Sequence, residues 1–295
     1  MTNYAQPSIT VNVDVTNPGQ FFACCGLLEL ADRLWPGTEG WFERDRFCIA
    51  CPDGNPIETV LDSLAQSTVS NTMSTTQQSR LRQLSSMSRK QRAGESGLES
   101  EKKALEALRR EEPIVLRGPI MLRIDWFRDE FAGGSRFKTW AGQQSVLDIA
   151  TAMHAGIKSA GVQCGETIWN NARGTGLPFN FDSDLGGQGS ALDIGFSFDP
   201  LAESAATRIE GTCKPALELL SFVGLQRFRP RQIAGANRYV YTAWQTPLPT
   251  SVAPCVACHC VRISEDPCYE FRLLYRTKYL KSFCPAIPFQ GDHNE

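Results

Sequence analysis

The sequence predicts an α+β protein in which a mixed or antiparallel sheet is packed by helices. Three observations predict this class: apolar residues alternate over 8–15, an almost wholly apolar stretch follows at 17–35, and β-type segments return after residue 113. A chain of 295 residues suffices for one large domain or two ordinary ones. Because neither a repeat nor a clean linker interrupts it, we expect a single compact domain over 1–295 with a polar insertion at about 67–112.

The N-terminal strand and helix give the clearest local signals. The alternation over 8–15 places Ile9, Val11 and Val13 on one face of a strand. Residues 18–35 predict a helix that is buried on nearly all sides, since few of its side chains are polar. Asn17 can cap this helix.

Gly26 lies in the middle of the same predicted helix, where glycine costs about 1 kcal/mol relative to alanine. Such a cost suggests that another element approaches the helix closely at this point. One or two strands are then expected within 41–51, followed by a turn at 52–55 and a short helix at 57–64. This β-α-β-α opening would suit a ferredoxin-like start.

The composition changes sharply over 67–100, where serine, threonine, glutamine and arginine dominate. Such a segment cannot bury enough apolar surface to fix itself, so we expect a mobile loop or a loosely packed helical insertion. A charged helix is expected at 101–112. The insertion holds five cations within 80–92 and no acid among them: Arg80, Arg82, Arg89, Lys90 and Arg92.

The second half continues the alternation of strands and helices. We expect β structure over 113–126 and a helix over 140–159 that includes His154 as a packing residue. The remaining predicted elements are paired strands at 180–184 and 193–199, a helix at 215–228, and strands at 238–245, 255–263 and 268–275.

Composition and charge exclude several classes of protein. Hydrophobic residues make up 42% of the chain and charged residues 21%, which is typical of a globular protein. A formal net charge of -2 excludes a wholly basic protein that coats nucleic acid, but not a local basic face. We see no run of about 18 apolar residues and no signal peptide, so we expect a cytoplasmic protein without a membrane partner.

The eleven cysteines are expected to be reduced, and most of them to act as small buried apolar side chains. Two C-x-x-C pairs, Cys48 with Cys51 and Cys255 with Cys258, can together supply four thiolates to zinc. The residues between them suit strands, however, where positions i and i+3 face opposite sides. We therefore expect no cofactor and keep zinc as the alternative.

Two carboxylates offer the main alternative to a binding protein. Asp182 and Asp184 would share one face of a strand beside the glycine-rich turn 185–189, which is suitable geometry for Mg²⁺ and nuclease chemistry. Aspartates that flank loops are more often solvated turn residues. We expect the chain not to be an enzyme, with a metal-dependent nuclease as the alternative.

Basic and aromatic residues interleave in three further stretches. Cations neutralise phosphates while exposed rings stack on unpaired bases, so these stretches predict contact with nucleic acid. A solvated helix end is the simpler interpretation of the middle one. The candidate residues are Arg136, Lys138 and Trp140, then Arg227, Arg229 and Arg231, then Arg276, Lys278 and Lys281.

Three segments of the chain carry a family resemblance. The stretch NPGQFFACCGLLELADRLW at 17–35 resembles the N-terminal signature of a CRISPR-associated family found with type I-U (also called I-G) systems. The stretch PALELLSFVGLQRFRP at 215–230 resembles that family's second signature, and 193–201 is also similar to it. The three anchors span most of the chain.

The resemblance implies a subunit of a Cascade-type, RNA-guided surveillance complex in antiviral defence. Its implied partners are the CRISPR guide RNA, target DNA, other effector-complex subunits and a helicase-nuclease. Guide pairing reads the sequence in such complexes while proteins hold backbones and read a short flanking motif. We therefore expect a non-catalytic RNA- and DNA-binding subunit, or alternatively a module that contacts only protein. The chain is short for a large subunit, which leaves an accessory or backbone-like role open.

Overall fold

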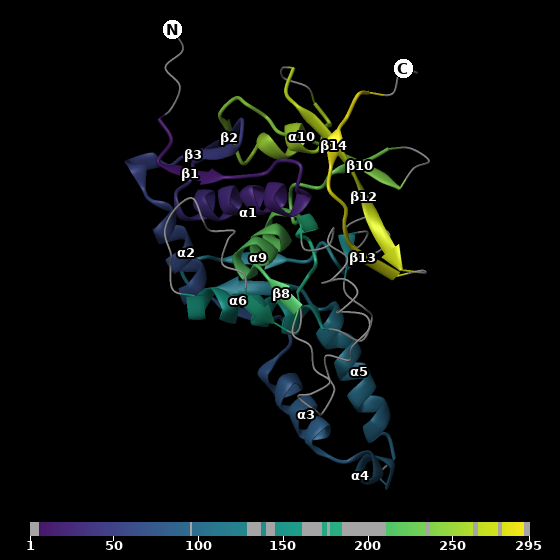
Figure 1. Cartoon of the computed structure of the whole chain (residues 1–295). Helices are drawn as coiled ribbons and strands as arrows, with labels where there is room; N and C mark the ends of the chain where they lie inside the picture. Colours follow the sequence, from purple (N-terminus) through teal and green to yellow (C-terminus); the bar gives the residue numbers. More distant parts are fainter. Residues whose placement is uncertain are drawn as a thin grey trace.

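The protein has the predicted α+β fold, with helices packed against antiparallel sheets (Figure 1). The structure is a computed structural model. In the part of the chain that it describes, every strand pairing is antiparallel. The described residues are 6–94, 96–128, 137–139, 145–160, 173–175, 178–184, 211–233, 237–261, 265–276 and 279–291.

The first sheet follows the predicted opening of the chain. Ile9 lies opposite Ile49 and Val11 opposite Phe47, and all four side chains are buried on the core face. The chain runs β-α-β-β-α as a ferredoxin-like unit would, but the next strand, β4, pairs in a different sheet, so the ferredoxin-like start stays a prediction. The strand order is β1 (Ile9–Asn12), β3 (Arg46–Ala50), β2 (Glu39–Glu43) and β11 (Leu248–Pro249).

Three further sheets complete the β structure of the described residues. The second has the order β13 (Tyr279–Phe283), β12 (Cys268–Arg276), β10 (Arg238–Thr242) and β9 (Arg231–Gln232), with β14 (Ile287–Pro288) paired to β12. The third has the order β4 (Thr68–Asn71), β5 (Ile114–Arg117) and β6 (Leu122–Ile124). A two-stranded sheet joins β7 (Arg173–Thr175) to β8 (Gly211–Cys213).

Helix α1 (Pro18–Leu34) begins as the sequence predicts. The side-chain oxygen of Asn17 accepts hydrogen bonds from the backbone N–H of Gly19 at 3.0 Å and of Gln20 at 3.3 Å. These bonds satisfy amide groups that otherwise have no partner in the first turn of a helix. Positions 18–31 are all buried, because sheets and other helices surround the helix.

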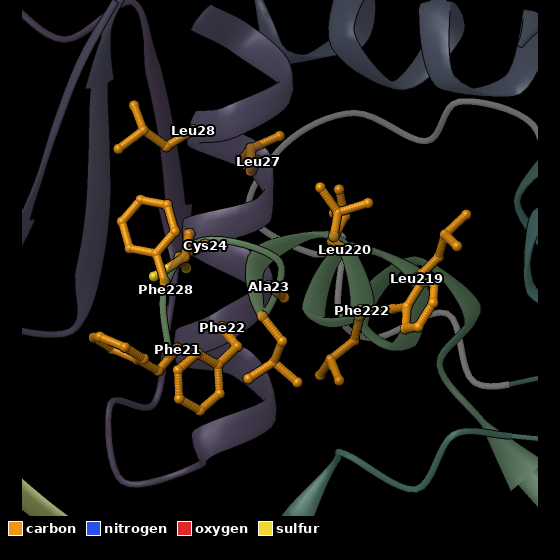
Figure 2. Packing of buried hydrophobic residues seen from close by; sticks show 14 of the residues in the cluster. Phe21, Phe22, Ala23, Cys24, Leu27, Leu28, Leu219, Leu220, Phe222 and Phe228 are labelled. Carbon is orange, nitrogen blue, oxygen red and sulfur yellow. The ribbon is translucent and has the colours of Figure 1, made fainter. Parts of the chain in front are cut away.

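Helix α9 (Pro215–Gly224) crosses α1 so closely that the two backbones touch (Figure 2). A Cβ atom added to Gly26 would lie 1.9 Å from the carbonyl oxygen of Leu220, and one added to Gly224 would lie 2.0 Å from that of Phe22. Only glycine fits at both positions. The close approach predicted from Gly26 is therefore confirmed.

Aromatic side chains fill the core around this crossing. Phe21 stacks on Phe42 with ring centroids 5.1 Å apart, and the indole N–H of Trp244 donates to the carbonyl of Gly40 at 2.6 Å. The indole N–H of Trp126 donates to the carbonyl of Phe222 at 3.1 Å. The core therefore joins β1–β3, α1 and α9 to the C-terminal strands.

From residue 75 on, the predicted polar insertion forms three helices that extend from the body of the molecule (Figure 1), whereas residues 68–71 form β4 of the third sheet. We call this region the helical arm; it comprises α3 (Thr75–Ser86), α4 (Arg89–Gly94) and α5 (Leu98–Glu111). A reciprocal capping box between Ser74 and Gln77 starts the arm, and Leu81 and Leu84 are its buried apolar side chains. The helical form of the predicted insertion is therefore the one adopted.

Some predicted elements differ from the structure. The strand expected at 255–263 is instead the short helix α10 (Ala253–Ala257), and 178–184 forms no strand. The predicted strand 193–199 lies outside the described residues. Among the other helices of the described ranges are η1 (Pro52–Gly54), α2 (Ile57–Gln66) and α6 (Val146–Ala160), the last starting later than the predicted residue 140. No helix in the described ranges is both long and apolar enough to cross a membrane.

Candidate nucleic-acid interface

Two of the five arm cations hold the arm together. Arg80 donates to both carboxylate oxygens of Glu101, at 2.8 and 2.7 Å. Arg92, which is only 8% exposed, pairs with Glu99 at 3.0 Å and donates to the carbonyls of Leu84, at 2.9 Å, and Met87. Each arginine lowers the pKa of its carboxyl partner by hydrogen bonding. Phosphate contact by these two arginines stays a prediction, but here carboxylates of the same chain already occupy them.

The other three arm cations face solvent. Arg82 lies on α3, and Arg89 and Lys90 begin α4; all three are exposed and make no ion pair with a described residue. No aspartate or glutamate occurs between positions 63 and 94, so no acid on α3 or α4 offsets their charge. Because like charges repel, such a group is stabilised by a bound polyanion.

The three arginines that follow α9 differ in their exposure and in their hydrogen-bond and ion-pair partners. The Arg227 guanidinium pairs with Glu29 at 3.2 Å and donates to the carbonyl of Thr250 at 3.2 Å. Glu29 is buried and also accepts from Arg33 at 2.7 Å. Arg229 is half-buried and donates to the carbonyl of Gln226 at 3.3 Å.

Arg231 on β9 is exposed, and the Arg227 side chain is also 41% exposed although it pairs with Glu29. The clamp of Arg227, Arg229 and Arg231 is thus not one open surface. Arg227 is held against the C-terminal half of α1 instead. Phosphate binding by the clamp residues remains a prediction.

The structure describes the other two basic-aromatic stretches only in part. Arg136, Trp140 and Lys278 lie outside the described residues. Lys138 is half-buried between the buried Phe137 and Thr139. The backbones of Arg276 and Lys281 lie in β12 and β13, which pair in an antiparallel hairpin.

The carboxylates proposed for metal binding form a different kind of site. Asp182 is 1% exposed; its Oδ1 accepts from Asn17 Nδ2 at 2.7 Å and from the backbone N–H of Asp184 at 3.1 Å. Its Oδ2 lies 2.9 Å from Lys214 Nζ, which is also 3.6 Å from Asp184 Oδ2. The lysine ammonium thus lies between the two carboxylates, where a divalent cation would bind. The nuclease alternative stays a prediction that this arrangement does not favour.

A fourth ionisable group completes this buried polar cluster. The Glu218 carboxyl is buried beside Asp182, and burial together with that negative charge raises its pKa to about 8. It accepts the backbone N–H groups of Phe181 at 3.2 Å and Asp182 at 3.3 Å. A pKa of about 8 favours the protonated form of Glu218 at neutral pH. Sequence reasoning missed Lys214 and Glu218, because nothing local in the sequence shows that either residue lies beside Asp182.

The two cysteine pairs lie on different elements. Cys48 lies on β3 as predicted, whereas Cys255 and Cys258 lie on α10 and at its end, where positions i and i+3 share a face. The strand argument against zinc was therefore wrong for the second pair. Within the described ranges, no group of three or more histidine, cysteine, aspartate or glutamate side chains is placed to hold a metal ion. Zinc binding stays untested.

Comparison with known proteins returned no match to a family model, a curated protein or a solved structure. The resemblance to the CRISPR-associated family thus remains an interpretation of the sequence. Its two main segments, 17–35 and 215–230, contain α1 and α9, which cross in the core. The residues that carry the resemblance are therefore mainly packing residues.

Proposed function

We propose that the chain is a non-catalytic nucleic-acid-binding subunit of a type I-U/I-G CRISPR surveillance complex. It would act in the cytoplasm with guide RNA, target DNA, other subunits and a helicase-nuclease, and take part in reading a flanking motif. The proposal of nucleic-acid binding rests on the helical arm, where Arg82, Arg89 and Lys90 are exposed and α3 and α4 contain no acid. The sequence resemblance supports the assignment to the complex.

The ion pairs of the arm support this role physically. Arg80 with Glu101 and Arg92 with Glu99 fasten α3 and α4 to α5 before any ligand binds. A surface that is already ordered loses less conformational entropy on binding. Each phosphate neutralised by an exposed cation releases condensed counterions, which favours binding at low salt. The small negative net charge does not oppose this, because local potential governs association.

The test is a triple variant, Arg82→Ala with Arg89→Ala and Lys90→Ala. Binding of a labelled single-stranded oligonucleotide to the purified chain is measured by fluorescence anisotropy over a salt series. Because about 0.7 counterions are released per phosphate on single strands, the slope of log K against log salt should become shallower by about 2. Arg46→Ala is the matched control, an exposed cation on β3 far from the arm (Figure 1).

Unchanged affinity and unchanged salt slope in the triple variant would overturn the role of the arm. Loss of binding in Arg46→Ala as well would point to a diffuse charge effect instead. The complex assignment is tested separately by co-purification of the tagged chain from its native cells. Guide RNA and a helicase-nuclease should be recovered with it, and their absence would contradict the assignment.

A further inference from the structure

A thiol and an imidazole meet at one end of the second sheet. Thr242, the last residue of β10, lies directly opposite Cys268, the first residue of β12. His259 follows α10 and reaches both side chains. Its Nδ1 lies 2.9 Å from Thr242 Oγ1 and 3.4 Å from Cys268 Sγ, and these two atoms are 3.5 Å apart.

The backbone around His259 fixes this geometry. The N–H of Cys260 donates to the carbonyl of Cys255 at 2.9 Å, and the N–H of His259 donates to that of Val256 at 2.9 Å. This pair of bonds is a Schellman motif, in which the residue after the helix end adopts a left-handed conformation. His259 does so, with φ of 55°. Glycine usually takes this position, and a larger residue there is strained.

A fourth segment supports the thiol from the C-terminal side. The N–H of Phe289 donates to the carbonyl of Cys268 at 2.8 Å, and the Phe289 ring lies edge-on to the His259 ring at 5.8 Å. The Cys268 thiol also lies 3.4 Å from the carbonyl oxygen of Asp266, to which it can donate. Cys268 and His259 are both half-buried, so packing limits the positions that the two side chains can take.

We propose that Cys268 is a reactive thiol that exchanges with low-molecular-weight disulfides, with His259 as its base. An imidazole within hydrogen-bond reach activates a thiol because the thiolate is the nucleophile. Nδ1 of His259, with the ring proton on Nε2, takes the thiol proton. The hydroxyl of Thr242 holds the ring in position.

The exchange balances without any other reactant. The Cys268 thiolate attacks one sulfur of R–S–S–R, a new bond forms between Cys268 Sγ and that sulfur, and the original sulfur–sulfur bond breaks. The departing thiolate takes the proton from His259 and leaves as R–SH. The products are one mixed disulfide on the chain and one free small thiol.

Other thiols of the chain provide internal comparisons. Cys255 and Cys260 are exposed, and Cys284 is half-buried like Cys268. Cys24 and Cys25 are fully buried, which raises the pKa of both thiols and makes them unreactive. If exposure alone set reactivity, Cys255 and Cys260 would react first.

The experiment exposes the purified full chain to oxidised glutathione and follows each cysteine by site-resolved mass spectrometry. Cys268 should form the mixed disulfide about 10-fold faster than the exposed Cys260. In His259→Asn the Cys268 rate should fall about 10-fold, while the Cys260 rate stays unchanged. Asparagine is the chosen substitute because it tolerates the left-handed conformation.

Two results would overturn the proposal: a Cys268 rate no higher than that of Cys260, or an unchanged Cys268 rate in folded His259→Asn. If that variant does not fold, the reaction rates of the cysteines in the unsubstituted chain still test the proposal. There Cys268 must react faster than Cys284, which has similar burial, and equal rates would contradict the proposal. None of these outcomes depends on nucleic-acid binding.

Discussion

The α1–α9 crossing and the helical arm are stabilised in different ways. At the crossing, two glycines bring backbones into contact within an apolar core, and nearly every side chain is buried. In the arm, two arginine–carboxylate pairs join the helices, and α5 has no buried residue. We infer that the crossing sets global stability, whereas the arm can open without unfolding the body.

The largest effect is expected from Gly26→Ala. The added Cβ would overlap the carbonyl oxygen of Leu220 at 1.9 Å, and a backbone atom cannot move aside as a flexible side chain does. Unfolding free energy, measured with urea, should fall by about 3 kcal/mol or more. Gly94→Ala in the arm is the control, since nothing lies within 4 Å of its Cβ position, and it should be neutral or slightly stabilising. An equal loss of unfolding free energy in Gly26→Ala and Gly94→Ala would contradict the inferred difference between the crossing and the arm.

The next effect concerns the buried cluster beside the crossing. Glu218 has a pKa of about 8 in the folded protein, above its ordinary value of 4.5. The folded state thus binds more protons between these values, so its stability should fall as pH rises from about 4.5 to about 8 and should change no further above that. Glu218→Gln should remove the part of this decrease in stability that comes from ionisation of Glu218. Urea midpoints from mildly acidic to mildly alkaline pH measure it, and an unchanged pH dependence in the variant would contradict the assignment.

The smallest effect is local to the arm. Arg92→Ala leaves the carbonyl of Leu84 without its charged donor, which should weaken the arm by about 1–3 kcal/mol. Hydrogen exchange should speed up for α4 amides and stay unchanged for α1 amides. Arg82→Ala, an exposed arginine on the neighbouring helix, is the control and should change neither. Faster exchange throughout α1 would show that the arm and the core unfold together.

Sequence reasoning succeeded where local signals determine local structure. Asn17, Pro18 and a mostly apolar run specify α1, and Gly26 indicated its close neighbour. It was wrong at 255–263, because a short apolar run of alanine, valine and cysteine fits a strand as well as a helix. In the structure the beginning of this run belongs to α10, which starts after Val252.

Contacts between distant positions could not be read from the sequence. Glu99 and Glu101 follow the acid-free stretch, and nothing local shows that they pair with Arg92 and Arg80. Lys214 reaches Asp182 only because both approach the N-terminal end of α1, where Asn17 also binds Asp182. Side-chain partners of this kind depend on the assembled fold.

Salt weakens the ion pairs that hold the arm together, in addition to screening its exposed cations. Arg80 and Glu101 are 36% and 41% exposed, so mobile ions screen their attraction, whereas the Arg92 side chain is 10% exposed and is shielded better. A concentrated electrolyte would therefore loosen the α3–α5 contact while the α4 end stays closed. The affinity of the arm for nucleic acid should then fall with ionic strength more steeply than it would if only the three exposed cations were screened.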